Sequence, residues 1–160
     1  MLVNSINENV FNTKASHIVF AINKEGYNDA GFAGAVVAQG WKEIENCGKH
    51  EIGTVLSKTI GDKTFHGIVC HSLNEGWGDN QVETIKNCFN NIPVDDDEPI
   101  SSIAIGTGFV GRLSGANFKK IVRGMHESNK TVILHSGFTL EELMEFVEED
   151  KNIIRLQKKN

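Results

Sequence analysis

The sequence predicts an α/β fold with three layers (α/β/α), in which helices cover both faces of a mixed central sheet. Strand candidates alternate with helix candidates along most of the chain, which is typical of this class. The run from His17 to Ile22 is almost continuously apolar, as expected for a strand buried on both faces. Gly61-Asp62 separates two further strand candidates and is a good hairpin turn, so part of the sheet is expected to be antiparallel.

We expect ten elements in chain order, and their evidence differs between strands and helices. The strand predictions rest on short apolar or β-branched runs bounded by turn residues. The helix predictions rest on apolar residues at helical spacing, such as Val82 and Ile85, and on caps. Asp79 is expected to cap one helix, and Thr139 with Glu142 forms a capping box before another. The expected elements are a short strand at 9–12, a strand at 17–22, a helix at about 32–45, strands at 54–60 and 65–72, a helix at 81–90, a strand at 100–105, a helix at 118–128, a strand at 131–134 and a helix at 140–149.

Length and charge limit the number of domains and the kinds of partner. The chain has 160 residues, 39% hydrophobic and 23% charged, which suits one domain, 1–160, with a single sizeable core. The formal net charge is −5, and Lys and Arg form no long block. Proteins that bind duplex nucleic acid usually carry a basic stripe, so no duplex partner is expected. A small anionic ligand stays compatible, because backbone N–H groups and helix N-termini can hold phosphate.

The cysteines and the N-terminal segment bear on the compartment. No apolar run approaches the ~20 residues that cross a bilayer. The segment Met1 to Glu8 has neither the basic start nor the apolar centre of a signal peptide. Cys47, Cys70 and Cys88 are an odd number without paired spacing, which favours reduced thiols. We therefore expect a cytoplasmic protein with no membrane partner.

A glycine-rich stretch, SSIAIGTGFVGRLSGANF from Ser101 to Phe118, follows a strand candidate. Its pattern from Gly106 to Gly111 fits the fingerprint by which Rossmann domains hold a dinucleotide pyrophosphate. That fingerprint belongs on the first strand of its domain, whereas Gly106 lies two-thirds along this chain. The next strand ends at His135-Ser136, where the acid for the ribose hydroxyls is missing. A nicotinamide-dependent oxidoreductase is therefore the least favoured alternative, and the stretch is interpreted as a phosphate-contacting turn.

A second glycine-rich loop, INKEGYNDAGFAGA from Ile22 to Ala35, also leads from a buried strand into a helix. Its helix begins with small residues, which allow backbone to approach a ligand closely. Loops at the carboxyl ends of strands in an α/β sheet can converge on a crevice where ligands bind. The two loops together therefore predict one shared anion site.

The two loops resemble those of the macro domain, an α/β module that binds ADP-ribose and related nucleotides. The resemblance covers about 7–143. Phe20-Ala21-Ile22-Asn23 takes the place of the family's Asn-Ala-Ala-Asn, and the stretch from Gly31 to Val36 takes that of its glycine cluster and helix start. The stretch from Gly106 to Gly111 lines up with the family's second loop, and Phe65 to His71 with its middle strand.

The resemblance implies a nucleotide site at the ends of these strands. Asn23 would hydrogen-bond the distal ribose, while Asn9 and Val10 would lie at the adenine, where the family usually carries an Asp. Two groups of backbone amides would clamp the diphosphate, and Phe109 or Val110 would pack on the distal ribose. The ligand-binding residues implied in this way are Asn9, Val10, Ile22, Asn23, Gly31, Phe32, Ala33, Gly34, Ala35, Gly106, Thr107, Gly108, Phe109, Val110 and Gly111.

The resemblance also implies an activity, although several positions depart from the family's hydrolases. Ala33 stands where one hydrolase branch has a water-orienting Asp, and Asn28 where some members have a His. Asn23 and Asn28 are therefore the catalytic candidates, and water held by carboxamides predicts slow turnover. The favoured function is hydrolysis of ADP-ribose 1″-phosphate or of a mono-ADP-ribosyl linkage. The alternative is a binder that sequesters or senses an ADP-ribose-like nucleotide.

Other side chains have both a functional and a structural interpretation. The partner implied is a small nucleotide, with an ADP-ribosylated macromolecule as a further candidate, and no cofactor is implied. No metal site is predicted, because the Cys and His residues lack paired ligand spacing. His71 and His135 end strands and either face the cleft or are structural. Trp77 either stacks on a base or covers the edge of the core, which we favour, and Trp41 is expected in the core.

Overall fold

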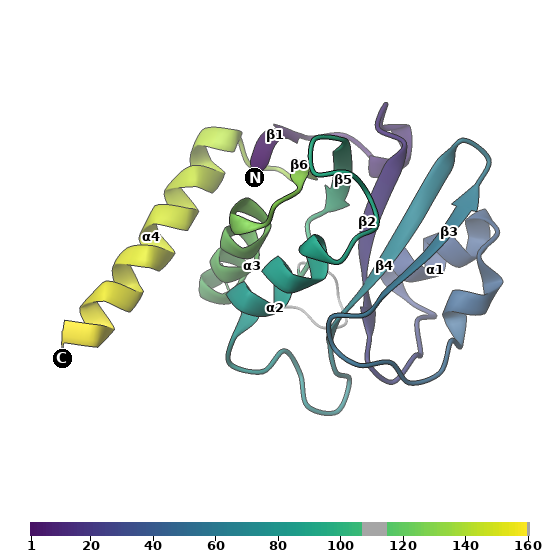
Figure 1. Ribbon diagram of the computed structural model, residues 1–160, viewed down its shortest axis with the longest axis horizontal. Coiled ribbons are helices and arrows are strands. Elements are labelled where there is room, and N and C mark those ends of the chain that lie inside the picture. Colours follow the sequence, from purple (N-terminus) through teal and green to yellow (C-terminus); the bar gives the residue numbers. More distant parts are fainter. Residues whose placement is uncertain (107–114, 160) are drawn as a thin grey trace.

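The computed structural model describes residues 1–106 and 115–159. Six strands form one sheet in the order β1-β6-β5-β2-β4-β3 (Figure 1). Only β3 and β4 pair antiparallel among these neighbours, across the predicted turn at Gly61-Asp62. The sheet is therefore mixed, as the sequence predicts. The strands are β1 (Leu2–Ile6), β2 (His17–Asn23), β3 (Val55–Ile60), β4 (Lys63–His71), β5 (Pro99–Ile103) and β6 (Thr131–His135).

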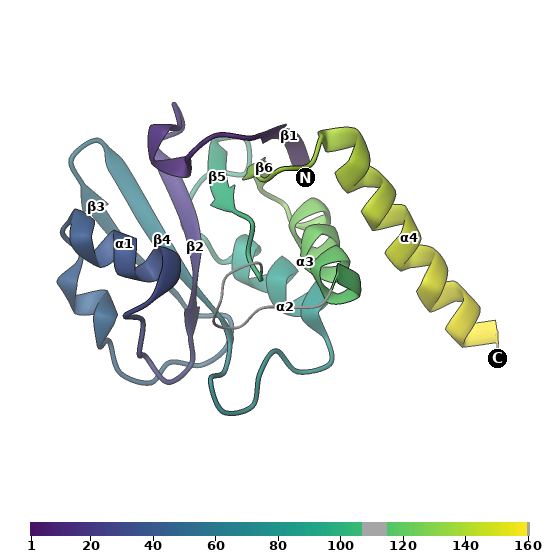
Figure 2. The ribbon, with the colours of Figure 1, turned by 180° about the vertical axis from the view of Figure 1, so that it is seen from behind.

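Helices cover both faces of this sheet. Figures 1 and 2 look at the molecule from opposite sides, with α2 in front of the sheet in the first and α1 in front in the second. The long helix α4 packs on α3 and β1 at the β1 edge. The helices are α1 (Gly31–Gln39), α2 (Gln81–Asn90), α3 (Gly115–Glu127) and α4 (Leu140–Lys159), with short 3₁₀ helices η1 (Val10–Asn12) and η2 (Lys42–Glu45). In the described part of the chain, no helix combines the length and apolar character that crossing a bilayer requires.

The central strand β2 divides the core in two. Ile18, Phe20 and Ile22 pack with α1 residues on one face, and each is at most 1% exposed. Val19 points to the other face and joins the larger cluster under α2 and α3. Alternate residues of a strand point to opposite faces, so a strand that is apolar at every position must be covered on both. The prediction of a doubly buried strand is confirmed.

Three predicted elements differ from the structure for identifiable reasons. The segment 9–12 is the helix η1 rather than a strand, because Asn9 caps a tight turn. The helix expected at 32–45 ends at Gln39, where Gly40 has φ 128°, and Trp41 is buried in the turn before η2. Asp79 does not occupy the cap position of α2, which is Asn80 and makes no side-chain cap hydrogen bond.

Two further differences concern the ends of the chain. The edge strand β1 was not expected, because Asn4 and Ser5 interrupt its apolar character and its pairing with β6 is not visible locally. Helix α4 continues past 149, where Asp150, buried at 2% exposure, pairs with Arg123 at 3.0 Å. The capping box at its start is confirmed, with Thr139 and Glu142 bonded reciprocally at 3.1 Å.

A glycine sets the distance between α2 and α3. A Cβ on Gly124 would lie 2.7 Å from the Val82 carbonyl oxygen and 2.8 Å from Ile85 Cβ. Contacts this short require the helices to separate. Alanine favours a helix over glycine by about 1 kcal/mol, but overpacking costs about 1–3 kcal/mol.

We expect Gly124→Ala to lower the free energy of unfolding by about 1 kcal/mol or more, because the packing term exceeds the propensity gain. Urea denaturation measures the change. Gly137→Ala is the matched control, since a Cβ there has no atom within 4 Å and should change stability by less than about 0.5 kcal/mol. Equal stability of the two variants would contradict the close packing of α2 on α3.

A hydrogen-bonded chain of side chains lies near the start of β2. Ser57 Oγ is 2.6 Å from His66 Nδ1, His66 Nε2 is 2.8 Å from His17 Nδ1, and His17 Nε2 is 3.3 Å from Glu98 Oε1. Burial, with a smaller contribution from the neighbouring His17, lowers the pKa of His66 to about 4. The unfolded chain therefore binds a proton at His66 that the folded chain does not bind between about pH 6.5 and pH 4.

Stability should fall as the pH drops through this window, because the lowered pKa favours the unfolded state. We expect His66 to contribute a loss of about 2 kcal/mol between pH 7 and pH 4.5. His66→Gln keeps a polar side chain but does not titrate, so its unfolding free energy should change less over the same range. Urea denaturation at both pH values measures this, and an equal loss in parent and variant would assign the acid sensitivity to other groups.

Candidate functional site

Asn23 ends β2 and closes the loop that follows. Its Oδ1 accepts hydrogen bonds from the backbone N–H groups of Gly26 and Tyr27, at 2.9 and 3.1 Å. Its Nδ2 donates to the Tyr27 carbonyl at 2.6 Å and to Asn28 Oδ1 at 3.0 Å. The residue is 5% exposed. The side chain that was expected at a ribose is thus turned into its own loop.

Asn28 holds this loop against the segment that follows α1. Its Oδ1 also accepts from the Asn23 backbone N–H at 3.1 Å, and its Nδ2 donates to the Ile44 carbonyl at 3.1 Å and approaches Cys47 Sγ at 3.7 Å. Burial raises the pKa of the Cys47 thiol, so this sulfur is a neutral thiol at pH 7. Asn28 is 5% exposed, so both predicted catalytic carboxamides are buried side by side.

Backbone hydrogen bonds complete the frame around the loop. Lys24 N–H donates to the His71 carbonyl at 2.8 Å, and Lys24 carbonyl accepts from His50 N–H at 3.0 Å. Gly26 has φ 86°, and a Cβ there would lie 2.1 Å from the Gly48 carbonyl oxygen. Position 26 therefore requires glycine for both its conformation and its space.

Glu25 joins the same loop to the segment after β4. Its carboxylate accepts from the Ser72 hydroxyl at 2.5 Å and from the Leu73 backbone N–H at 2.7 Å. These hydrogen bonds, with that of Ser72 foremost, lower the pKa of the Glu25 carboxyl. The loop after β2 is thus tied to its neighbours on both sides.

Helix α1 begins where this framed loop ends. The cap residue Ala30 has no side chain to bond the first N–H groups, which also have no partner within a helix. Gly31 is exposed with φ 60°, and a Cβ on Gly34 would lie 3.0 Å from the Asp29 carbonyl oxygen. The helix therefore begins with N–H groups that no side-chain cap satisfies, at the positive end of its dipole.

The residues expected at an adenine lie beside this helix start. Asn9 Oδ1 accepts from Phe11 N–H at 3.0 Å and so caps η1, while Val10 is buried at 4% exposure in the α1-side core. The Phe11 ring stacks on Phe32 of α1, with centroids 5.0 Å apart and an interplanar angle of 13°. The structure therefore brings the 9–11 segment and the α1 N-terminus together.

A buried polar network that the sequence analysis did not identify fixes the 8–13 segment. His135 Nδ1 donates to the Glu8 carbonyl at 3.0 Å, and His135 Nε2 lies 3.1 Å from Ser101 Oγ. Ser101 Oγ is in turn 2.6 Å from Thr13 Oγ1. Of the two interpretations of His135, these contacts support the structural one. The sequence could have indicated this network through two adjacent serines, Ser101 and Ser102, inside an otherwise apolar strand. Both are 0% exposed in the structure.

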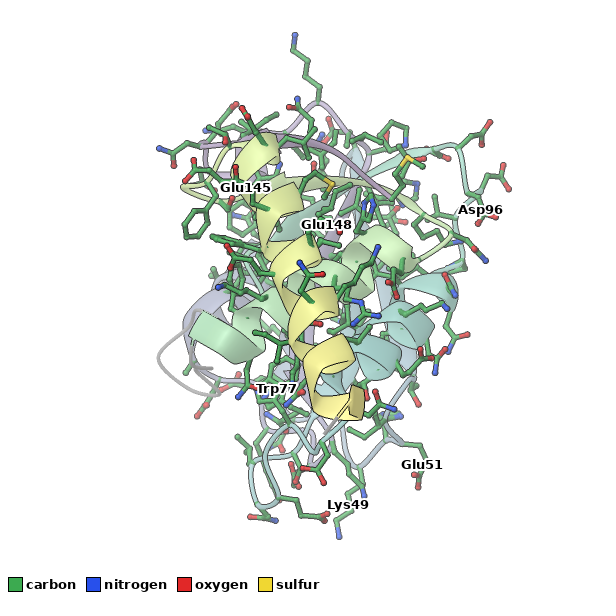
Figure 3. All side chains as sticks on the ribbon, turned by 90° about the vertical axis from the view of Figure 1, so that its left-hand side faces the viewer. Lys49, Glu51, Trp77, Asp96, Glu145 and Glu148 are labelled. Carbon is green, nitrogen blue, oxygen red and sulfur yellow. The ribbon has the colours of Figure 1, made fainter. Side chains whose placement is uncertain are left out.

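His71 and Trp77 stack at the end of β4, with centroids 5.0 Å apart and an interplanar angle of 19°. Burial lowers the pKa of His71, with Glu25 opposing the shift, so the imidazole is neutral at pH 7. Trp77 also packs against the larger core cluster, which agrees with the covering role. In Figure 3, Trp77 lies at the same end as Lys49 and Glu51 and far from Asp96, whose loop precedes β5. This end carries the loops that follow β2 and β4.

The second predicted loop is described only as far as Gly106, which has φ 88° and follows β5 closely. Among residues 1–106 and 115–159, no group of three or more His, Cys, Asp or Glu side chains is arranged to hold a metal ion. The predicted ligand-binding residues Thr107, Gly108, Phe109, Val110 and Gly111 lie outside the described residues.

No protein-family model and no curated protein matches the sequence. Solved structures do match at the level of fold. A variant macrodomain of Oceanobacillus iheyensis with ADPR is 17% identical with TM-score 0.63, and the match covers 94% of this chain and 91% of that one. The macrodomain of Thermus aquaticus DarG is 16% identical with TM-score 0.60, covering 85% and 98%.

A longer protein also contains the fold. An alphavirus P23pro-zbd structure is 13% identical with TM-score 0.57, and the match covers 96% of this chain but only 23% of that protein. The sheet order, the helices on both faces and these matches lead to one conclusion: the chain has the macrodomain fold.

Proposed function

We propose that this protein binds ADP-ribose or a related nucleotide at the α1 N-terminus. The observation that carries the proposal is the rigidly framed loop from Asn23 to Asn28, which delivers uncapped N–H groups beside the η1 segment. Such donors suit phosphate groups and other small anions. Macrodomains of the same fold solved with ADPR or ADP support this choice of ligand.

The proposed contacts follow the site's geometry. The first amides of α1, at Gly31, Phe32 and Ala33, would donate to the diphosphate. Gly34, whose N–H already donates to the Ala30 carbonyl at 3.2 Å, and Ala35 would line its path, and Asn9, Val10 and Ile22 would lie at the nucleoside. Gly106 and the loop after it, Thr107 to Gly111, would close the diphosphate from the other side. An ADP-ribosylated macromolecule is a further proposed partner, because it would present the same group.

Hydrolysis is the second proposal. Asn23 and Asn28 could position water only after releasing hydrogen bonds that they make within the loop. His71 pairs with Asn23 in the register of β2 and β4, and its neutral imidazole can accept a proton from water. This neighbouring base supports the proposal of slow hydrolysis of a distal-ribose phosphate or an ADP-ribosyl linkage, rather than binding without turnover.

Gly34→Val should weaken ADP-ribose binding by about tenfold or more, equivalent to about 1.4 kcal/mol, because the added side chain crowds Asp29 and the phosphate path. Isothermal titration calorimetry measures the affinity. Ala38→Val is the matched control, since Ala38 is exposed one turn further along α1. Unchanged affinity in Gly34→Val, or an equal loss in both variants, would contradict a diphosphate site at the start of α1.

Phosphate release from ADP-ribose 1″-phosphate tests the hydrolytic proposal, with a mono-ADP-ribosylated peptide as a parallel substrate. We expect slow turnover by the parent and a reduced kcat with a nearly unchanged KM for His71→Gln, because the base is lost while the ligand loop is kept. His126→Gln is the control histidine variant, because His126 lies on α3 and its side chain accepts a hydrogen bond from the Leu2 N–H of β1. A parent that binds ADP-ribose but releases no product at high protein concentration would leave binding as the function.

A further inference from the structure

The carboxamide of Asn23 has no hydrogen-bonding capacity left for a ligand. A carboxamide offers two donor hydrogens and an oxygen with two lone pairs. Both lone pairs are used by Gly26 and Tyr27 N–H, and both hydrogens by the Tyr27 carbonyl and Asn28 Oδ1. The opposite orientation of the amide would set its NH₂ against two N–H donors, so the surroundings determine which atom is the oxygen.

Asn28 is committed in the same way. Its Oδ1 receives both the backbone N–H and the side-chain Nδ2 of Asn23, and its own Nδ2 points to the Ile44 carbonyl and Cys47. The two residues therefore form one buried unit that ties the end of β2 to the segment after α1. Freeing either carboxamide for a ligand would leave buried backbone groups unpaired, which is costly.

We propose that Asn23 and Asn28 are positioning residues, which set the path of the loop into α1 and contact no part of the nucleotide. This inference rests on the proposed function and deepens it, because it predicts which part of the ligand the loop recognises. The loop leads to the α1 amides, which suit a diphosphate. Asn23 therefore acts on the diphosphate through the loop and does not read the distal ribose.

ADP and ADP-ribose separate these roles, because they share the adenosine diphosphate and differ in the distal ribose. Asn23→Ala should weaken both ligands by the same factor, about tenfold and within about twofold of each other, as measured by calorimetry. Asn46→Ala, at an exposed position near the loop, is the control and should leave both affinities unchanged. A loss confined to ADP-ribose, or no loss for either ligand, would overturn the inference.

Asn23→Asp sharpens the comparison. The carboxylate keeps the acceptor for Gly26 and Tyr27 N–H but loses both donors and faces the Tyr27 carbonyl and Asn28 Oδ1. A positioning role therefore predicts that Asp is as damaging as Ala for both ligands. If Asn23 instead accepted a bond from a ribose hydroxyl, Asp would retain the preference for ADP-ribose, and the inference would fail.

Amide hydrogen exchange tests the buried unit without any ligand. In the parent, the Tyr27 N–H, which donates to Asn23 Oδ1, should be protected, and Asn23→Ala should remove that protection while the β2 amides keep theirs. The Gly26 N–H also donates to the Asn23 backbone carbonyl at 3.2 Å, so its protection should fall less. Unchanged protection of the Tyr27 N–H would overturn the inference. If the parent binds neither nucleotide, the proposed function is wrong, but the hydrogen-exchange result still decides the role of Asn23. If Asn23→Ala does not fold, Asn28→Ala undergoes the same calorimetry with the same expected affinities. In that variant the Asn23 N–H, which donates to Asn28 Oδ1, is the amide expected to lose protection, and unchanged protection there would overturn the inference.

Discussion

The structure depends on burying β2 on both of its faces. Covering a strand twice excludes water from its backbone, so every polar group at its end must find a partner in the protein. Within β2 the neighbours β4 and β5 supply those partners. Where the pairing ends, Asn28 Oδ1 accepts from the Asn23 N–H, and the Asn23 side chain accepts from two N–H groups of the turn that follows. The shape of the candidate site is therefore a consequence of how the central strand is terminated.

The elements that depend on local pattern were predictable. A few neighbouring residues are enough to predict the apolar run of β2, the hairpin between β3 and β4 and the capping box of α4. The strand β1 does not, because its stability comes from pairing with β6 more than a hundred residues away. The start of η1 was misassigned for a related reason, since Val10 satisfies a strand pattern equally well and only the Asn9 cap decides.

In the candidate site, too, features set by local sequence were predictable and features set by distant contacts were not. The identities of Asn23 and Asn28 could be taken from the sequence, but their roles could not, because the Asn28 side chain bonds to Ile44 and approaches Cys47, which lie beyond α1 in the chain. The Glu25 bond to Ser72 joins residues that no spacing rule relates. Sequence pattern locates such a loop, whereas its hydrogen-bonding state is a property of the packed fold.

A protein of net charge −5 that holds a diphosphate must overcome a repulsive long-range field. Backbone N–H groups at a helix start can do so, because their attraction acts within hydrogen-bonding distance and adds no net charge. Such donors have fixed positions only if the preceding loop is rigid. A flexible loop would lose conformational entropy on binding, and this loss would lower the affinity. In the proposed site, small residues would keep the donors reachable and the two buried asparagines would keep them in place. An anionic chain that uses amides rather than cationic side chains therefore needs a loop as tightly bonded as the one between β2 and α1.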